Sequence, residues 1–203
     1  MGDIVLAGST SGTVTISPPS VAGTTTLMLP STSGNVLTSA SSLTASQLPA
    51  GSVLQVVQGT KTDAFTTTST SFVIPTGLSV SITPSSSSSK FFIICYTNFA
   101  VSADTGHTYA RLQRDGTGLN VADAASSRPV AAIAQNNYGE ASPPNFSLCY
   151  LDSPSTTSAI TYSFGIRSSN GTTVYLNRSP RDADAGTFDG RSSSAIIVME
   201  VKG

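Results

Sequence analysis

Residues 90–101 read KFFIICYTNFAV, and this stretch decides the fold of the 203-residue chain. Its first part, FFIIC at residues 91–95, is apolar without alternation, as expected for a strand that is covered on both faces. The segment AIIVM at residues 195–199 repeats this pattern near the C-terminus. Because Val, Ile and Phe suit strands, we expect two central core strands, with the end of the chain fixed inside a sheet.

Strand-like segments continue on both sides of residues 90–101, without a competing 3.6-residue periodicity of apolar residues. Asp-Gly and Asn-Gly supply the positive φ angles of tight turns, so residues 114–118 (RDGTG) and 169–172 (SNGT) predict two hairpins. We expect an antiparallel β-sandwich or jelly-roll head over residues 52–203. Its further candidate strands are residues 53–60, 70–75, 78–83, 107–114, 128–135, 145–152, 159–167 and 172–179.

Ahead of the head, glycines recur at Gly2, Gly12, Gly23 and Gly34, and each precedes a short apolar or β-branched burst. Alternation within the bursts places apolar side chains on one face of a strand. One such unit is too small to fold alone, so we interpret residues 1–38 as a β-repeat stalk that stacks or wraps around symmetry mates. A disordered Ser/Thr/Gly linker is the alternative. The residues expected to serve assembly and attachment are Ile4, Val5, Leu6, Val14, Ile16, Leu27, Leu29, Val36 and Leu37.

The charges of the chain are unevenly placed, because Asp3 is the only charged residue before Lys61. We expect this uncharged segment to be covered by sister chains or by another protein. With 10 Lys and Arg against 11 Asp and Glu, the chain has no basic field for nucleic acid, and no run of residues is long and apolar enough for membrane insertion. Residues 39–51 are interpreted as a connector with a helical turn that Pro49 ends.

The sequence contains few residues and motifs that are typical of catalytic sites. His107 is the only histidine and no GxSxG motif supplies a nucleophile, while Glu140 and Glu200 are the only glutamates. We therefore expect no enzyme and no cofactor. Cys95 and Cys149 both lie in apolar strand-like runs and are interpreted as small buried hydrophobic residues.

The acidic segment RDADAGTFDG at residues 181–190 offers weak candidates for a calcium site. The alternative is an exposed loop in which Arg181 and Arg191 neutralise the carboxylates. The candidate metal ligands are Asp182, Asp184 and Asp189, and the candidates for an exposed contact surface are Tyr138, Phe188 and Arg191.

Residues 8–38 (GSTSGTVTISPPSVAGTTTLMLPSTSGNVLT) and 39–58 resemble the repeat and connector of structural proteins from tailed phages, notably those that infect cyanobacteria and other aquatic bacteria. Residues 70–96, 147–179 and 194–201 are similar to the heads of such phage fibre or surface proteins. The resemblance implies a homotrimer on the virion surface, assembled in the bacterial cytoplasm, with a head like the jelly rolls of complement-type and tumour-necrosis-factor-type trimers.

Tail fibres of short-tailed phages usually begin with a larger tail-attachment domain, and none precedes this repeat. The resemblance therefore favours a capsid decoration (cement) protein or short head fibre that binds the major capsid protein through its N-terminal segment. The alternative is a tail fibre or receptor-binding protein that recognises a host surface glycan or protein.

Overall fold

The computed structural model describes residues 4–17, 19–21, 23–24, 26, 31–33, 42–136, 138, 143–184 and 187–203. The chain divides into two compact units, Met1–Ser42 and Leu43–Gly203. Both consist of antiparallel strands, and the only helical element in the described residues is a single 3-10 turn. The expectation of an all-β, antiparallel fold is confirmed.

The first unit contains a small hairpin, in which β1 (Ile4–Ala7) pairs with β2 (Thr13–Ile16). Ile4 lies opposite Ile16 and Leu6 lies opposite Val14, so these four side chains share one face. Two of the predicted bursts are therefore strands. The candidates of the later bursts lie outside the described residues: Leu27, Leu29, Val36 and Leu37.

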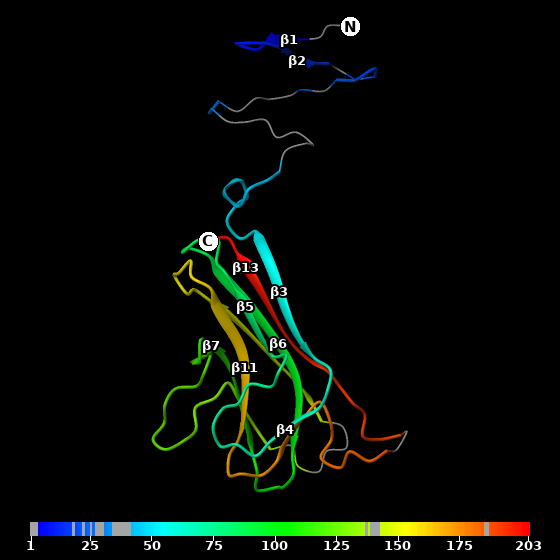
Figure 1. Ribbon diagram of the computed structural model, residues 1–203, viewed down its shortest axis with the longest axis vertical. Helices are drawn as coiled ribbons and strands as arrows, with labels where there is room; N and C mark the ends of the chain where they lie inside the picture. Colours follow the sequence, from blue (N-terminus) through cyan, green and yellow to red (C-terminus); the bar gives the residue numbers. More distant parts are fainter. Residues whose placement is uncertain are drawn as a thin grey trace. The chain divides into compact units, whose positions relative to one another are not determined.

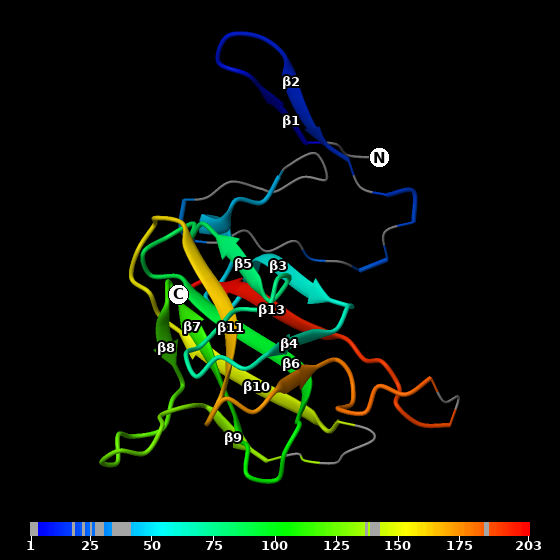
Figure 2. The same ribbon diagram turned by 60° about the horizontal axis from the view of Figure 1, so that its bottom comes forward.

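The first sheet of the second unit is curled and built around β6 (Lys90–Val101). Figure 2 shows its main strands side by side in the order β3, β13, β6 and β10, and β12 and β4 continue the sheet along the second half of β6. The bounds of these strands are β3 Val53–Lys61, β13 Ser194–Val201, β10 Asn145–Asp152, β12 Val174–Leu176 and β4 Phe65–Thr67.

The second sheet has the order β5, β11, β7 and β8, with β9 also pairing with β7. Its strands are β5 Ser79–Ile82, β11 Ile160–Ser168, β7 Thr108–Arg114, β8 Thr117–Leu119 and β9 Ile133–Gln135. Figure 1 shows β11 and β7 of this sheet in front of and beside β6 of the first. Chain segments that are distant in sequence thus form both layers.

The inner faces of the two sheets share one hydrophobic core. Phe91 of β6 contacts Tyr162 of β11 at 5.7 Å between ring centroids, and Phe99 stacks on Phe146 at 4.3 Å. β6 and β13 each have a strand on both sides, so the prediction that both are central is confirmed. The completely buried residues of the core include Phe91, Ile93, Leu112, Ile166, Ile196 and Val198.

The two predicted hairpins have different outcomes. Asp115 (φ 48°) and Gly116 (φ 84°) form the tight turn between β7 and β8, as expected. The hairpin predicted at residues 169–172 is wrong, because β11 belongs to the second sheet and β12 to the first. Here the Asn170 Oδ1 accepts hydrogen bonds from the backbone N–H and the hydroxyl of Thr172, and the turn carries the chain between sheets.

Other strand predictions differ in detail. Residues 70–75 form only one isolated bridge, between Val73 and Ile166, and the short strands β4 and β8 were not expected. Of the remaining candidate segments, 145–152 matches β10 at both ends, and the others contain strands with shifted ends.

The connector holds the predicted helical turn, η1 (Ala45–Gln47), just before Pro49. The ammonium group of Lys202 donates hydrogen bonds to the carbonyl oxygens of Ser46, at 3.0 Å, and of Leu48. The N–H of Gly51 donates to the carbonyl of Lys202 at 2.8 Å. The C-terminus is thereby tied to the start of the second unit.

Candidate functional site

The outward face of the β3-β13-β6-β10 sheet carries apolar side chains from all four strands. Strand alternation buries Phe91, Ile93 and Cys95 in the core and turns the residues between them outward. One cross-strand row consists of Val56, Met199, Phe92 and Leu151, and the next of Gln58, Ile197, Ile94 and Cys149. We call the side chains of these two rows the apolar outer face.

This apolar outer face is uncharged. Val56 and Leu151 are 56% and 52% exposed, although large aliphatic side chains are usually covered. The nearest charged side chain on the outward side, Lys90, lies beyond the rows at the edge, opposite Val201. The sequence predicts that residues 91–95 are covered on both faces, but this chain covers only the inner one.

Two acidic residues of the same strands, Glu200 and Asp152, are buried instead. Glu200 is fully buried, and its carboxylate accepts hydrogen bonds from the hydroxyls of Ser85 and Ser89, the N–H of Ser85 and the amide of Gln55 at 2.5–2.7 Å. Burial alone raises the pKa of a carboxyl group, but these donors hold the pKa of Glu200 below its ordinary value. Glu200 thus fixes the serine-rich loop before β6 to β13 and β3.

Asp152, at the end of β10, is held in a similar way. Its carboxylate accepts hydrogen bonds from Arg114 at 2.6 Å and from the hydroxyl of Tyr162 at 2.7 Å. Burial lowers the pKa of Arg114, but the hydrogen bond to Asp152 and its negative charge outweigh burial and raise this pKa. Burial and the neighbouring Asp152 both raise the pKa of Tyr162. Both buried carboxylates therefore have structural partners.

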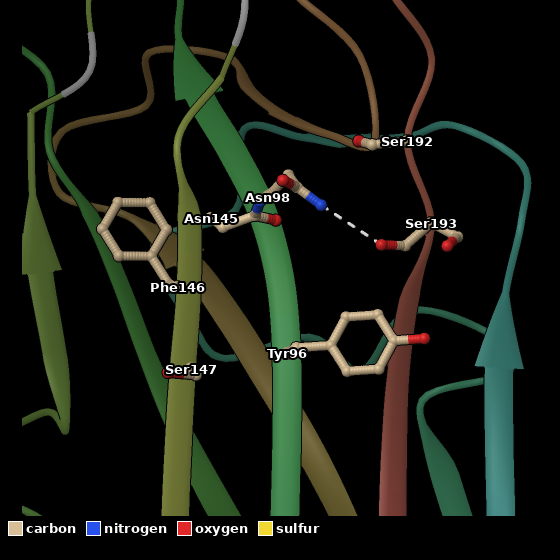
Figure 3. A pocket seen from close by; sticks show the side chains of 7 residues that line it. All are labelled: Tyr96, Asn98, Asn145, Phe146, Ser147, Ser192 and Ser193. Atoms are coloured by element: carbon tan, nitrogen blue, oxygen red, sulfur yellow. Dashed lines mark hydrogen bonds between the residues drawn. The ribbon is translucent and has the colours of Figure 1, made fainter.

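A hollow of about 590 Å³ adjoins the apolar outer face at the end where β10 and β13 begin. Figure 3 shows Tyr96 and Asn98 of β6 beside Asn145 and Ser147 of β10, and the amide of Asn98 donates to the carbonyl of Ser193 at 3.1 Å. The hollow has no charged lining residue among those described, so it suits hydrogen bonding to neutral polar groups.

The acidic segment forms ion pairs with arginines. Asp182 contacts Arg178 at 3.0 Å and Arg191 at 2.8 Å, and Asp189 contacts Arg181 at 2.7 Å. Hydrogen bonds from Arg181 and from Ser179 lower the pKa of Asp189. No group of three His, Cys, Asp or Glu that could hold a metal ion occurs in the part of the chain that the structure describes. Asp184 lines the same loop without joining these ion pairs.

The exposed-contact candidates do not form one surface. Phe188 is 61% exposed, and the guanidinium carbon of Arg181 lies 5.6 Å from the centroid of the Phe188 ring. Phe188 and Arg191 line the same hollow. Tyr138, 54% exposed, belongs to a different segment, where it bridges to Val101. The nine assembly candidates include five described residues of the first unit, all at least half exposed: Ile4, Val5, Leu6, Val14 and Ile16.

A cluster of arginine and aromatic side chains on the outward side of the second sheet was not foreseen. The guanidinium carbons of Arg111 and Arg167 lie 4.0 Å and 5.4 Å from the centroid of the Phe72 ring, and that of Arg167 lies 4.8 Å from the Tyr109 ring. We call these four residues the arginine stack. The pairing of β7 with β11 assembles it, so local sequence patterns gave no signal.

The two cysteines differ in burial, and the histidine lies against a tyrosine ring. Cys95 is buried, which raises its pKa to about 12, whereas Cys149 is exposed, so the prediction that both are buried is wrong for Cys149. Cys95 lies opposite Leu148, which places Cys149 on the other side of the sheet. The ring of His107 stacks on Tyr109 at 6.4 Å.

Comparison with known protein families finds none that matches this chain, and comparison with curated proteins finds no similar one. Within the described ranges there is no helix with the length and apolarity needed to cross a membrane.

Proposed function

We propose that this protein is a non-enzymatic structural protein of a phage virion, a homotrimer that decorates and stabilises the capsid. The phage assignment comes from the resemblance of the repeat and head segments. The single structural observation that carries the assembly is the apolar outer face, which one chain leaves uncovered. Contiguous exposed apolar patches often mark interaction sites between proteins.

The strand pairing supports a jelly-roll head. β3 pairs with β13, β5 with β11, β6 with β10 and β7 with β9, in the nested order that one long hairpin produces. The additional pairs β13–β6 and β11–β7 connect different parts of this long hairpin, so that its strands form two sheets. Eight strands connected in this way form two Greek keys, which is the topology of a jelly roll.

The apolar outer face is large enough to form part of an interface. With strands about 4.8 Å apart and a rise of about 3.3 Å per residue, two rows across four strands take up about four residues of each strand and span roughly 250 Å². At about 25 cal/mol per Å², covering it contributes on the order of 6 kcal/mol. Association itself costs roughly 4–15 kcal/mol, so a stable trimer needs this face together with further contacts.

The first unit is the natural source of those contacts. A two-stranded hairpin is marginally stable alone, and β1 and β2 leave their shared apolar side chains half exposed or more. No Lys, Arg, Asp or Glu occurs from residue 4 to residue 60, so close approach of identical copies brings no charge repulsion. In the proposal, the hairpins meet sister hairpins and the major capsid protein.

The mass of the full chain in solution tests the assembly. Light scattering at micromolar concentration should give three times the mass of the chain. A dimer would refute the three-fold symmetry, and a monomer would refute the assembly.

Location on the virion separates the proposal from its alternative, a tail fibre or receptor-binding protein. Antibody labelling of purified virions and of tail-less heads should mark both particles at high copy number. Labelling confined to tails would refute a decoration protein and support the alternative, a tail fibre or receptor-binding protein. A variant without residues 1–38 should fold but fail to bind heads, and retained binding would contradict attachment through the first unit.

A further inference from the structure

The arginine stack carries positive charge that the described part of the chain does not neutralise. The ion pairs of the head engage Lys61, Arg114, Arg178, Arg181 and Arg191, but neither Arg111 nor Arg167 has an acidic partner. The guanidinium carbons of Arg111 and Arg167 lie 4.0 Å and 5.4 Å from the centroid of the Phe72 ring. The distance between the two carbons therefore cannot exceed the sum of these two distances. Two like charges are thus held close together on one surface.

The donors of the stack are also incompletely used. The Nε atoms of Arg111 and Arg167 are buried and have no hydrogen-bond partner. Arg167 donates from Nη1 to the carbonyl of Thr70 at 2.7 Å, whereas Arg111 makes no hydrogen bond within the described residues. Burial and the neighbouring charge of Arg167 lower the pKa of Arg111. Unpaired buried donors in a native fold are satisfied by water, by an ion or by a bound partner.

The backbone makes room for this arrangement. A Cβ atom at Gly118 would lie 3.3 Å from both Cδ and Nη1 of Arg111, and one at Gly165 would lie 2.4 Å from the amide of Gln113 and 3.5 Å from Phe72. Neither glycine has a positive φ angle that would require it. The absent side chain of Gly118 therefore leaves space for Arg111, and that of Gly165 leaves space for Gln113 beside the stack.

We propose that Arg111 and Arg167, oriented by Phe72 and Tyr109, form a binding site for an oxyanion, either a carboxylate or a phosphate group. A guanidinium group presents a planar set of donors that matches two oxygen atoms, and the aromatic rings restrict its rotation. Because the stack lies on the other sheet from the apolar outer face, assembly through that face leaves it accessible. This binding activity is separate from the proposed structural function.

The arginine side-chain N–H signals in NMR spectra of the full chain provide the test. Inorganic phosphate and glucuronate are the two probes, at matched ionic strength, and glucose is the neutral control. Saturable shifts of the Arg111 and Arg167 Nε–H signals are expected, with dissociation constants in the millimolar range. A response to one probe alone identifies phosphate or carboxylate as the preferred group. No saturable response to either probe would overturn the proposal.

Variants separate a built site from general electrostatics. Arg111→Gln should weaken binding at least about tenfold. Gly118→Ala keeps every charge but crowds Arg111, and should weaken binding by several fold. Arg128→Gln removes the same charge from an exposed position outside the stack and should leave affinity within about twofold. Equal losses for Arg111→Gln and Arg128→Gln, with both variants folded, would refute a specific site.

Discussion

The two sheets of the head share one core but differ in their outer faces. The β3-β13-β6-β10 sheet turns Val56, Ile94, Leu151 and other apolar side chains outward and keeps Glu200 inside. The β5-β11-β7 sheet turns Arg111, Arg167 and serines outward. Since the inner faces of both sheets pack into one core, the difference concerns what lies outside the chain. We infer that one face is covered by sister chains and that the other meets solvent and ligands.

Deletion of the last eight residues removes most of β13. We expect it to abolish folding of the head, so that neither outer face forms. β13 pairs with β3 and β6 and buries Ile196 and Val198. Truncating one large buried aliphatic side chain costs about 2–5 kcal/mol, and the whole domain has only about 5–15 kcal/mol of stability. Thermal unfolding followed by circular dichroism should show no cooperative transition. The variant lacking residues 1–38 is the control and should melt cooperatively; a cooperative melt of the C-terminal deletion would contradict the central position of β13.

A charge placed on the apolar outer face should separate assembly from folding. Ile197→Glu introduces a carboxylate in the middle of the second row, where an unpaired charge in an interface costs several kcal/mol. Light scattering should show a monomer with an intact head. Ser79→Glu adds the same charge at an exposed position on the outer side of the other sheet and should leave the mass unchanged. A trimeric Ile197→Glu variant would show that copies do not meet through this face.

Much of this architecture is predictable from local sequence, because strand propensity and alternation depend on neighbouring residues. The central strands and the turn at Asp115-Gly116 follow from such patterns. The turn at Asn170-Gly171 is equally typical of a hairpin, yet pairing is decided by contacts distant in sequence, and its flanking strands enter different sheets.

The candidate sites were harder to predict for the same reason. The exposure of Cys149 depends on its register with β6, and the arginine stack joins residues 72, 109, 111 and 167. The unalternating apolar run at residues 91–95 carries a prediction that one chain does not fulfil. It predicts cover on both faces, and the face that one chain leaves open is the proposed interface.

Acid should destabilise the head through Glu200, on the inner side of the first sheet. Its folded pKa is depressed, so its contribution is complete above the unfolded pKa of about 4.3 and is lost as the pH falls through the lower folded pKa. Glu200→Gln should lower the free energy of unfolding by about 1–3 kcal/mol at neutral pH, because several donors lose an ionised acceptor. Urea unfolding between pH 7 and pH 3 should show that the free energy of unfolding depends less on pH for the variant than for the unmodified protein. Parallel curves for both proteins would place the acid sensitivity elsewhere.

The reactivity of Cys149 offers the finest test of the comparison. Cys149 is exposed in one chain and lies beside Ile94 in the second row, while Cys95 faces the core with a pKa near 12. A thiol reagent therefore reports on the apolar outer face alone. Labelling of Cys149 should be at least about tenfold slower in the trimer than in monomeric Ile197→Glu, since the reagent must wait for the interface to open. Cys149→Ser should remain unlabelled, which checks the assignment. Equal rates in trimer and monomer would mean that Cys149 of β10 stays outside the contact.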